Sequence, residues 1–246
     1  MDRMLYVAMS GATETLKAQT ANNHNLANAS TTGFRADLAA FQSQSVKGAG
    51  YGTRAYATNS SVGFDATSGA MQSTGRDLDV AIQGSGYIAV QGRDGREAYT
   101  RAGNLRVDPT GQLMTAAGLQ VMGDAGPISV PPNASLLVGT DGTISIVPQG
   151  QGPETRSVVG RIKLVDPPTS QLVRSDAGVF RLNDGTDAPA SASVHLGSGM
   201  LESSNVNLAD TMVNMIELAR RYDLQVKAMR TAEDNGAASA QLLKNG

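Results

Sequence analysis

The sequence predicts an α+β protein: long N- and C-terminal helices that pair as a coiled coil, and a central antiparallel all-β domain. Three observations predict this fold. An apolar stripe with heptad spacing lies near the C-terminus, a second apolar stripe lies at the N-terminus, and the region between them alternates with period two between frequent turn signals. The expected domains are an N-terminal helix (1–35), a linker or extended arm (36–75), a β domain (76–200) and a C-terminal helix (201–246).

The N-terminal helix is expected over residues 3–28. This stretch contains good helix formers, no proline, and a single glycine, Gly11. Its apolar stripe consists of Leu5, Met9, Ala12 and Leu16, with a weaker continuation to Leu26. The segment 31–33 (Thr-Thr-Gly) is expected to end the helix.

Residues 36–75 carry little charge and are rich in Ser, Thr, Gly and Ala. Glycines punctuate the stretch 48–52. This composition favours a linker or an irregular extended arm over a packed element.

The central region is predicted to be antiparallel β. Leu78, Val80 and Ile82 alternate with Asp77, Asp79 and Ala81, which is typical of a half-buried strand. Turn signals follow about every ten residues, and no βαβ pattern occurs. They include Asp94-Gly95, the segment 108–111 (Asp-Pro-Thr-Gly) and Asp141-Gly142. Further strands are expected at 87–91, 97–100, 105–107, 112–115, 134–138, 143–147, 162–164 and 179–182.

The C-terminal helix is expected over residues 207–243, with Ser204 or Asn205 as its N-cap. Its apolar positions are separated by alternating steps of four and three, the spacing of a helix that buries one face against another helix. These positions are Leu208, Met212, Met215, Ala219, Tyr222, Val226 and Met229.

The composition excludes several classes of function. The net charge is −2 with a pI near 5.7, so no basic face for nucleic acid is expected. The chain contains no cysteine, which excludes disulfides, thiol catalysis and cysteine-ligated metals. No window approaches the roughly 20 apolar residues of a membrane span, and the N-terminus lacks the apolar core of a cleaved signal peptide. We therefore expect neither membrane insertion nor a cleaved signal.

Three candidate sites of chemistry have simpler explanations. The segment 84–89 matches G-x-G-x-x-A, but it leads into a predicted strand, whereas a dinucleotide loop must open a helix. His24 and His195 are the two histidines, and no ligand cluster accompanies either one. Asp77 and Asp79 share a strand face, which suits a glycosidase pair or simply the solvent side of a strand; we favour the solvent side. No catalytic, cofactor-binding or metal-binding residue is predicted, and the chain is not expected to be an enzyme.

Several motifs in this order resemble those of bacterial flagellar rod and hook proteins. They cover nearly the whole chain and lie at 25–28 (Asn-Leu-Ala-Asn), 31–35 (Thr-Thr-Gly-Phe-Arg), 79–87, 99–104, 108–113 and 199–207. Within this family the chain length and the segment 219–227 resemble the proximal rod type. Ala219 and Arg221 stand where the distal rod and hook types usually have Gln and Ala.

The resemblance implies a structural subunit of the flagellar basal body, in the rod that crosses the periplasm and transmits torque to the hook. Its partners would be copies of itself, other rod proteins and the type III export apparatus. Its terminal helices would form the inner tube. The distal rod or hook type is the alternative, and a β module that binds or cuts cell-wall glycan is a further one. The residues expected at the assembly interface are Leu5, Met9, Ala12, Leu16, Asn25, Leu26, Asn28, Gly33, Phe34, Asn205, Leu208, Met212, Met215, Ala219, Tyr222, Val226 and Met229.

Overall fold

The computed structural model describes residues 2–45, 55–152, 154–175 and 178–244. The chain divides into two compact units, which we call the helical unit and the β unit. The helical unit comprises Met1–Ala29, Ala36–Asp65 and Val206–Gly246, and the β unit comprises Ser30–Arg35 and Ala66–Asn205. The predicted α+β class, with helices at both ends of a mostly antiparallel β region, is confirmed.

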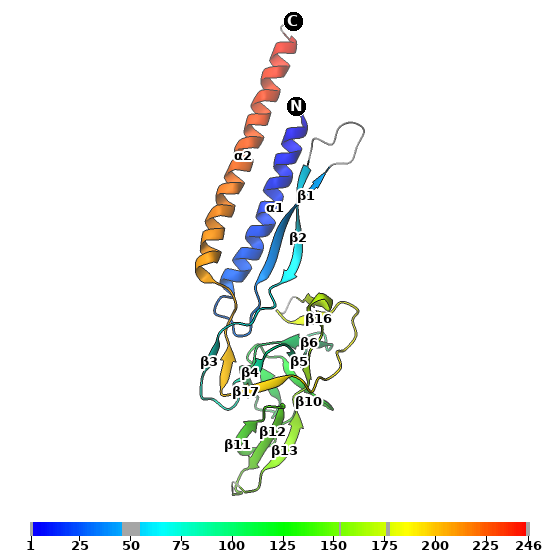
Figure 1. Ribbon diagram of the computed structural model, residues 1–246, viewed down its shortest axis with the longest axis vertical. Coiled ribbons are helices and arrows are strands. Elements are labelled where there is room, and N and C mark those ends of the chain that lie inside the picture. Colours follow the sequence, from blue (N-terminus) through cyan, green and yellow to red (C-terminus); the bar gives the residue numbers. More distant parts are fainter. Residues whose placement is uncertain (1, 46–54, 153, 176–177, 245–246) are drawn as a thin grey trace. The chain divides into compact units, whose positions relative to one another are not determined.

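Two helices and a hairpin form the helical unit. Helix α1 (Asp2–Ala27) and helix α2 (Leu208–Lys244) lie side by side, and α1 also contacts the hairpin of β1 (Asp37–Ser45) and β2 (Ala55–Phe64) (Figure 1). The helices run antiparallel, because Asn22 near the end of α1 donates a hydrogen bond to the Thr211 carbonyl at the start of α2 (2.9 Å). Neither described helix is long and apolar enough to cross a membrane.

Helix α2 begins with a different cap from the one expected. The side-chain oxygen of Asn207 accepts hydrogen bonds from the backbone N–H groups of Ala209 (3.0 Å) and Asp210 (3.4 Å). Asn207 is therefore the N-cap, because it satisfies donors of the first turn that have no partner within the helix. The expected caps were wrong. Asn205 lies in the β unit and donates its side-chain N–H to the Thr67 carbonyl instead (3.0 Å).

The region expected to be a linker or arm contains regular structure. Strands β1 and β2 pair antiparallel from Asp37 with Phe64 to Ser45 with Ala55, with a register shift between Leu38 and Ala39. Strand β3 (Met71–Ser73) follows in the β unit and pairs with β18 (Met200–Glu202). The expected arm at 48–52 lies outside the described residues.

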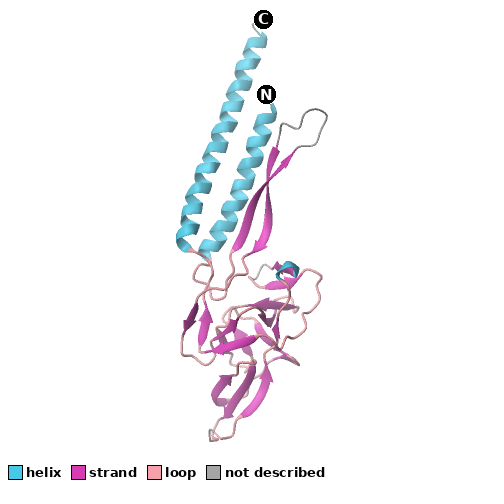
Figure 2. Ribbon diagram, viewed as in Figure 1, coloured by secondary structure: helices cyan, strands magenta, loops and turns pink. Residues whose placement is uncertain are grey.

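The β unit is built from antiparallel pairs (Figure 2). Its largest sheet has nine strands in the order β15-β16-β6-β5-β9-β8-β7, with β10 on β9 and β14 on β5. A three-stranded sheet β11-β12-β13 and the pairs β17-β4 and β18-β3 complete it. The remaining bounds are β4 Val80–Gln83, β5 Tyr87–Gln91, β6 Glu97–Thr100, β7 Leu105–Val107, β8 Leu113–Thr115, β9 Gln120–Gly123, β10 Gly126–Pro127, β11 Asn133–Val138, β12 Thr143–Pro148, β13 Ser157–Arg161, β14 Leu164–Val165, a 3-10 turn Thr169–Gln171, β15 Leu172–Arg174, β16 Phe180–Leu182 and β17 His195–Ser198.

An aliphatic core holds the β unit together. Val80, Ile88, Val90, Leu105 and Leu113 are among its fully buried members. These residues lie in strands that the alternation predicted. Burial of such side chains contributes about 1.5–3 kcal/mol each, which lets a unit with few aromatic residues close its core.

Candidate assembly surface

Large apolar side chains lie on the outward faces of both helices. Met9 is 50% exposed and Met212 is 47% exposed. Five of the residues expected at the assembly interface share this exposure, and the structure adds others on the same helices. The expected ones are Leu5, Met9, Leu16, Leu208 and Met212, and the additional ones are Met4, Tyr6, Val213, Ile216, Leu224 and Leu242.

The face of α2 turned toward its own chain differs from the predicted stripe. Apart from Val226, Ala228 and Ser239, which are half-buried, the buried and half-buried positions are Thr211, Met215, Leu218, Tyr222, Gln225, Met229 and Ala232. They also alternate by four and three, and they share Met215, Tyr222 and Met229 with the predicted stripe. Of the other predicted positions, Met212, Ala219 and Val226 each lie one residue further along the chain than a position of this inward face, and Leu208 lies before it. As a result Val226 is half-buried, whereas Leu208, Met212 and Ala219 are exposed.

Small residues on α1 explain why the inward face of α2 differs from the predicted stripe. The buried positions of α1 are Ala8, Gly11, Ala12, Thr15, Ala18 and Asn22. A Cβ atom on Gly11 would lie 2.9 Å from the side-chain amide of Gln225, so the two helices approach closely there. Small side chains permit this approach, and the larger Leu and Met side chains are left outside. Of the N-terminal stripe predicted by hydrophobicity, Ala12 is buried and Leu26 half-buried.

The segment 25–28 joins α1 to the hairpin. Asn25 donates its side-chain N–H to the Asp37 carbonyl (2.9 Å) and accepts from the Asp37 N–H (2.7 Å), so it pairs with the first residue of β1 as a neighbouring strand would. His24 Nδ1 lies 2.6 Å from Asp37 Oδ2. Asn28 donates its side-chain N–H to the His24 carbonyl at the end of α1 (2.9 Å). Asn25 and Asn28 are therefore positioned within this chain.

Gly33, Phe34 and Asn205 come together in the β unit. The Asn205 N–H donates to the Phe34 carbonyl (3.3 Å), and Phe34 is buried with the Arg174 guanidinium 4.8 Å from its ring centroid. Gly33 has a φ of +67°, and a Cβ atom there would lie 2.3 Å from the Arg101 backbone. The expected turn at Gly33 and Phe34 is thus a tightly packed one that requires glycine.

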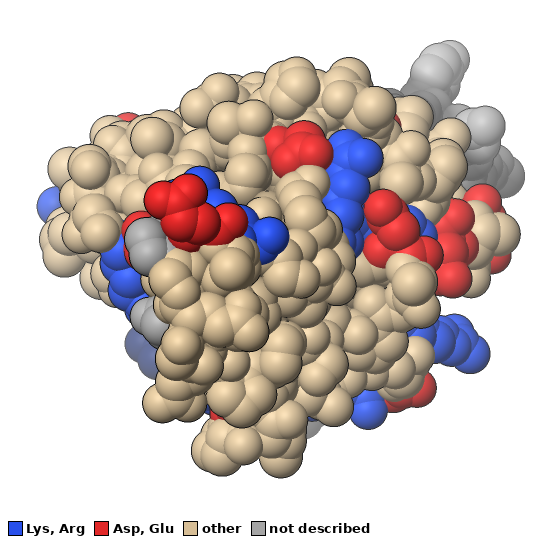
Figure 3. Space-filling view, turned by 90° about the horizontal axis from the view of Figure 1, so that it is seen from below, with Lys and Arg blue, Asp and Glu red and all other residues tan. Residues whose placement is uncertain are grey.

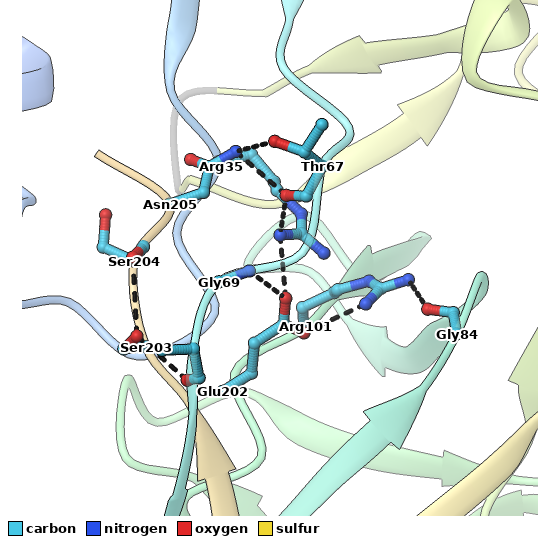
Figure 4. Close-up of polar contacts among 10 residues, drawn as sticks. Arg35, Thr67, Gly69, Gly84, Arg101, Glu202, Ser203, Ser204 and Asn205 are labelled. Atoms are coloured by element: carbon cyan, nitrogen blue, oxygen red, sulfur yellow. Dashed lines mark hydrogen bonds and ion pairs between the residues drawn. The ribbon is translucent and has the colours of Figure 1, made fainter. Parts of the chain in front are cut away.

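A buried ion cluster lies beside these residues (Figure 4). Glu202 and Arg35 are fully buried, and Arg101 is 4% exposed. Glu202 Oε1 accepts from Arg35 Nη1 (2.8 Å), and Glu202 Oε2 accepts from Arg101 Nη1 (3.0 Å). Burial lowers the pKa of Arg35, because removal from water disfavours the charged guanidinium, and Glu202 acts in the opposite direction.

Of the pair Asp77 and Asp79, only Asp77 lies on the solvent side as expected. Asp77 is exposed in a turn that the Asp79 N–H closes by donating to the Arg76 carbonyl (3.0 Å). Asp79 is buried, and its carboxylate lies 3.4 Å from Arg76 Nη1. The placement of Asp79 on the solvent side was wrong, because the strand begins only at Val80.

Other candidate sites have structural roles. The segment 84–89 leads into strand β5, as predicted. No group of three or more His, Cys, Asp or Glu suited to a metal occurs among the described residues. A cavity of about 550 Å³ is lined by Glu97 and Lys163 among others, but these two form an ion pair with each other (2.8 Å). On the face seen in Figure 3, acidic and basic side chains are interspersed among uncharged ones.

The residues expected to be functional from the sequence did not include four members of this region: Arg35, Thr67, Arg101 and Glu202. Arg35, Arg101 and Glu202 did lie inside the motifs 31–35, 99–104 and 199–207. Membership of these motifs was therefore the one sequence feature that could have pointed to these three residues. Periodicity cannot show that residues separated by 101 or more positions share one ion cluster.

Comparisons with known proteins agree on one family. Residues 81–146 match the family model described as flagellar hook protein FlgE/F/G D1 domain, and residues 198–242 match that of the flagellar basal body rod FlgEFG protein C-terminal region. The chain is 45% identical to flagellar basal-body rod protein FlgF of Escherichia coli strain K12, covering 99% of each chain, and 43% identical to that of Salmonella typhimurium with the same coverage. It is 33% identical to FlgG of Bacillus subtilis, covering 95% of this chain and 96% of the relative.

Proposed function

The chain belongs to the family of flagellar basal-body rod proteins, and from this premise we propose that it is a structural subunit of the proximal rod. Its role is to form part of the shaft that transmits torque from motor to hook, and it catalyses no reaction. Identity to the FlgF relatives of 45% and 43%, against 33% to the Bacillus FlgG, supports the proximal type over the distal one.

The observation that carries this proposal is the uncovered apolar surface of α1 and α2. Covering a half-exposed Leu or Met side chain contributes on the order of 1 kcal/mol, so the whole set contributes on the order of 10 kcal/mol. Association costs roughly 4–15 kcal/mol in lost freedom. A contact with one neighbour that covered only part of this surface would therefore be too weak. Covering the whole set requires several neighbours around each subunit, which an open helical array provides.

The helices of stacked copies form the inner tube in this proposal, packed as coiled coils through the outward apolar faces. The partners are copies of this chain and other rod proteins. The β unit faces outward, and the chain reaches the periplasmic rod through the flagellar export apparatus without signal cleavage. The tube domain then comprises the helical unit with its β1-β2 hairpin rather than the terminal helices alone.

The substitution Met212→Asp tests the interface. Met212 is exposed in the single chain, so the variant should fold, whereas burial of an unpaired carboxylate on assembly is costly. Met215 is less suitable, because it is half-buried in its own chain. The expected result is a purified protein with an unchanged melting temperature and cells that lack completed rods.

The matched control is Asn214→Asp, which adds the same charge at a nearby exposed polar position of α2. Cells carrying the control should swim and contain rods in isolated basal bodies. Normal rods in Met212→Asp cells would exclude this face from the assembly interface.

A further inference from the structure

The chain crosses between its two units four times, at 29/30, 35/36, 65/66 and 205/206, and the first two crossings flank one short segment, 30–35. Within the β unit, the segments that lead to these places are 33–35, 67–69 and 202–205. All three contact the buried cluster of Arg35, Arg101 and Glu202 (Figure 4), and Thr67 and Ser68 themselves are exposed. Two of the three lie in motifs that resemble the rod and hook family, and a third such motif supplies Arg101.

Glu202 contacts every one of these segments. Its backbone carbonyl accepts from the Gly33 N–H (2.8 Å), and its Oε1 accepts from the Gly69 N–H (2.9 Å) and from Arg35 Nη1 (2.8 Å). Its Oε2 accepts from Arg101 Nη1 (3.0 Å), and Arg101 in turn donates from Nη2 to the Gly84 carbonyl (2.6 Å). One residue therefore connects the three segments to each other and to the end of β4.

Additional contacts hold the same segments at close range. Asn205 donates to the carbonyl of Thr67 (3.0 Å), and Arg35 donates to that carbonyl as well. A Cβ atom on Gly69 would lie 2.0 Å from the Ser203 carbonyl oxygen, so the two backbones approach as closely as glycine allows. The Ser203 N–H donates to the Ala70 carbonyl (2.9 Å).

Stability alone does not account for a charged cluster at this depth. Apolar side chains of similar volume often serve a core equally well or better, and in some proteins buried charged groups are retained because they specify one arrangement. The contacts of the Glu202 carboxylate also fix the positions of particular groups, because it binds one backbone N–H and two guanidiniums from different segments.

We propose that Glu202 is a positioning residue that clamps the three segments leading to the helical unit, so that force enters the β unit through all three at once. The force-carrying part of this proposal rests on the proposed function as a rod subunit. The positioning part concerns the single chain and does not depend on assembly.

Hydrogen–deuterium exchange of the purified full chain tests the positioning part with Glu202→Gln. Gln keeps the shape of Glu but loses the charge that both guanidiniums share. The expected result is exchange about tenfold faster at 33–35 and 67–69, the effect of losing one hydrogen bond to a charged group, with little change in strand β5. The control Glu217→Gln, on the exposed surface of α2, should exchange as the parent does.

A uniform rise in exchange over the whole β unit, or no rise at all, would overturn the clamp. If Glu202→Gln does not fold, Glu202→Asp serves in its place, because it keeps the charge but shortens by one methylene the side chain that reaches Gly69, Arg35 and Arg101. Faster exchange confined to 33–35 and 67–69 supports the clamp, and unchanged exchange overturns it.

Rotation of tethered cells at graded viscosity tests the force-carrying part. A host that carries the clamp variant should rotate normally at low load and lose rotation at high load, with a normal number of rods. An equal loss at every load would contradict the force-carrying role. Absence of the protein from rods of the unmodified strain would instead contradict the proposed function.

Discussion

At the residue scale, short acidic turns stabilise the β7-β8 and β11-β12 hairpins and the turn that follows β16. Asp108 accepts hydrogen bonds from the Thr110 hydroxyl (2.7 Å), the Thr110 N–H (2.9 Å) and the Gln112 N–H (2.8 Å). The hydrogen bond from the Thr110 hydroxyl is the main reason why the pKa of Asp108 lies below its ordinary value of 3.8. Thr143 likewise lowers the pKa of Asp141, and the Thr186 N–H lowers that of Asp184.

These turns predict how stability depends on pH. A carboxyl group whose pKa is lower in the folded chain stabilises the fold above its unfolded pKa, and this stabilisation is lost as the pH falls through the folded value. Stability should therefore fall as the pH drops below about 3.8. The variant Asp108→Asn should lose less stability over this range, as measured by urea unfolding at a series of pH values. Parallel loss in parent and variant would contradict this role of Asp108.

The roles of some other residues could not be predicted from the sequence. The ion cluster of Arg35, Arg101 and Glu202 depends on contacts between distant segments, and a charged residue in a single sequence usually indicates solvent. Asp79 shows the same difficulty, because alternation with Val80 suggested an exposed strand face. Asn25, Asn28, Gly33, Phe34 and Asn205 were singled out through the family resemblance, and the structure gives them contacts within their own chain.

At the element scale, the close contact of α1 and α2 depends on small side chains. Ala12 is 6% exposed, so Ala12→Leu should overfill the packing around α1 and destabilise the helical unit by about 1–3 kcal/mol. Thr13→Leu is the control, because Thr13 lies exposed on the same helix. Thermal melting followed by helical circular dichroism measures both. Equal melting temperatures for the two variants would contradict close packing at Ala12.

The sequence predicts the bounds of the helices to within a residue or two and seven strands of the β unit in their places. Two more are predicted out of place: β4 begins only at Val80, and β14 begins only at Leu164, the last residue of the strand expected at 162–164. Strong periodicity explains this success, because a long amphipathic helix and a buried alternating strand both leave clear patterns. The hairpin β1-β2 and short strands such as β3, β10 and β15 were not predicted. Their small polar side chains or short lengths leave a weak pattern, and their partners in the sheets decide the structure.

At the scale of the whole molecule, the order of motifs carried the most information. Each motif alone is short, but the series from 25–28 to 199–207 in one order pointed to the family to which the chain belongs. The hydrophobic pattern predicted the positions of the helices correctly, but it predicted the wrong inward face for them. A sequence pattern shows that a helix has an apolar face, whereas the size of the facing side chains decides which residues stay uncovered.

The central claim is that the outward apolar faces of α1 and α2 become covered when copies assemble. The chain has no cysteine, so a single Met212→Cys variant can be labelled at one site with a maleimide. Met212 is 47% exposed in the single chain, so the purified variant should react quickly. In isolated basal bodies the same thiol should be protected, and it should react again once the rods are dissociated. Equally fast labelling in intact rods and in the free chain would contradict the account.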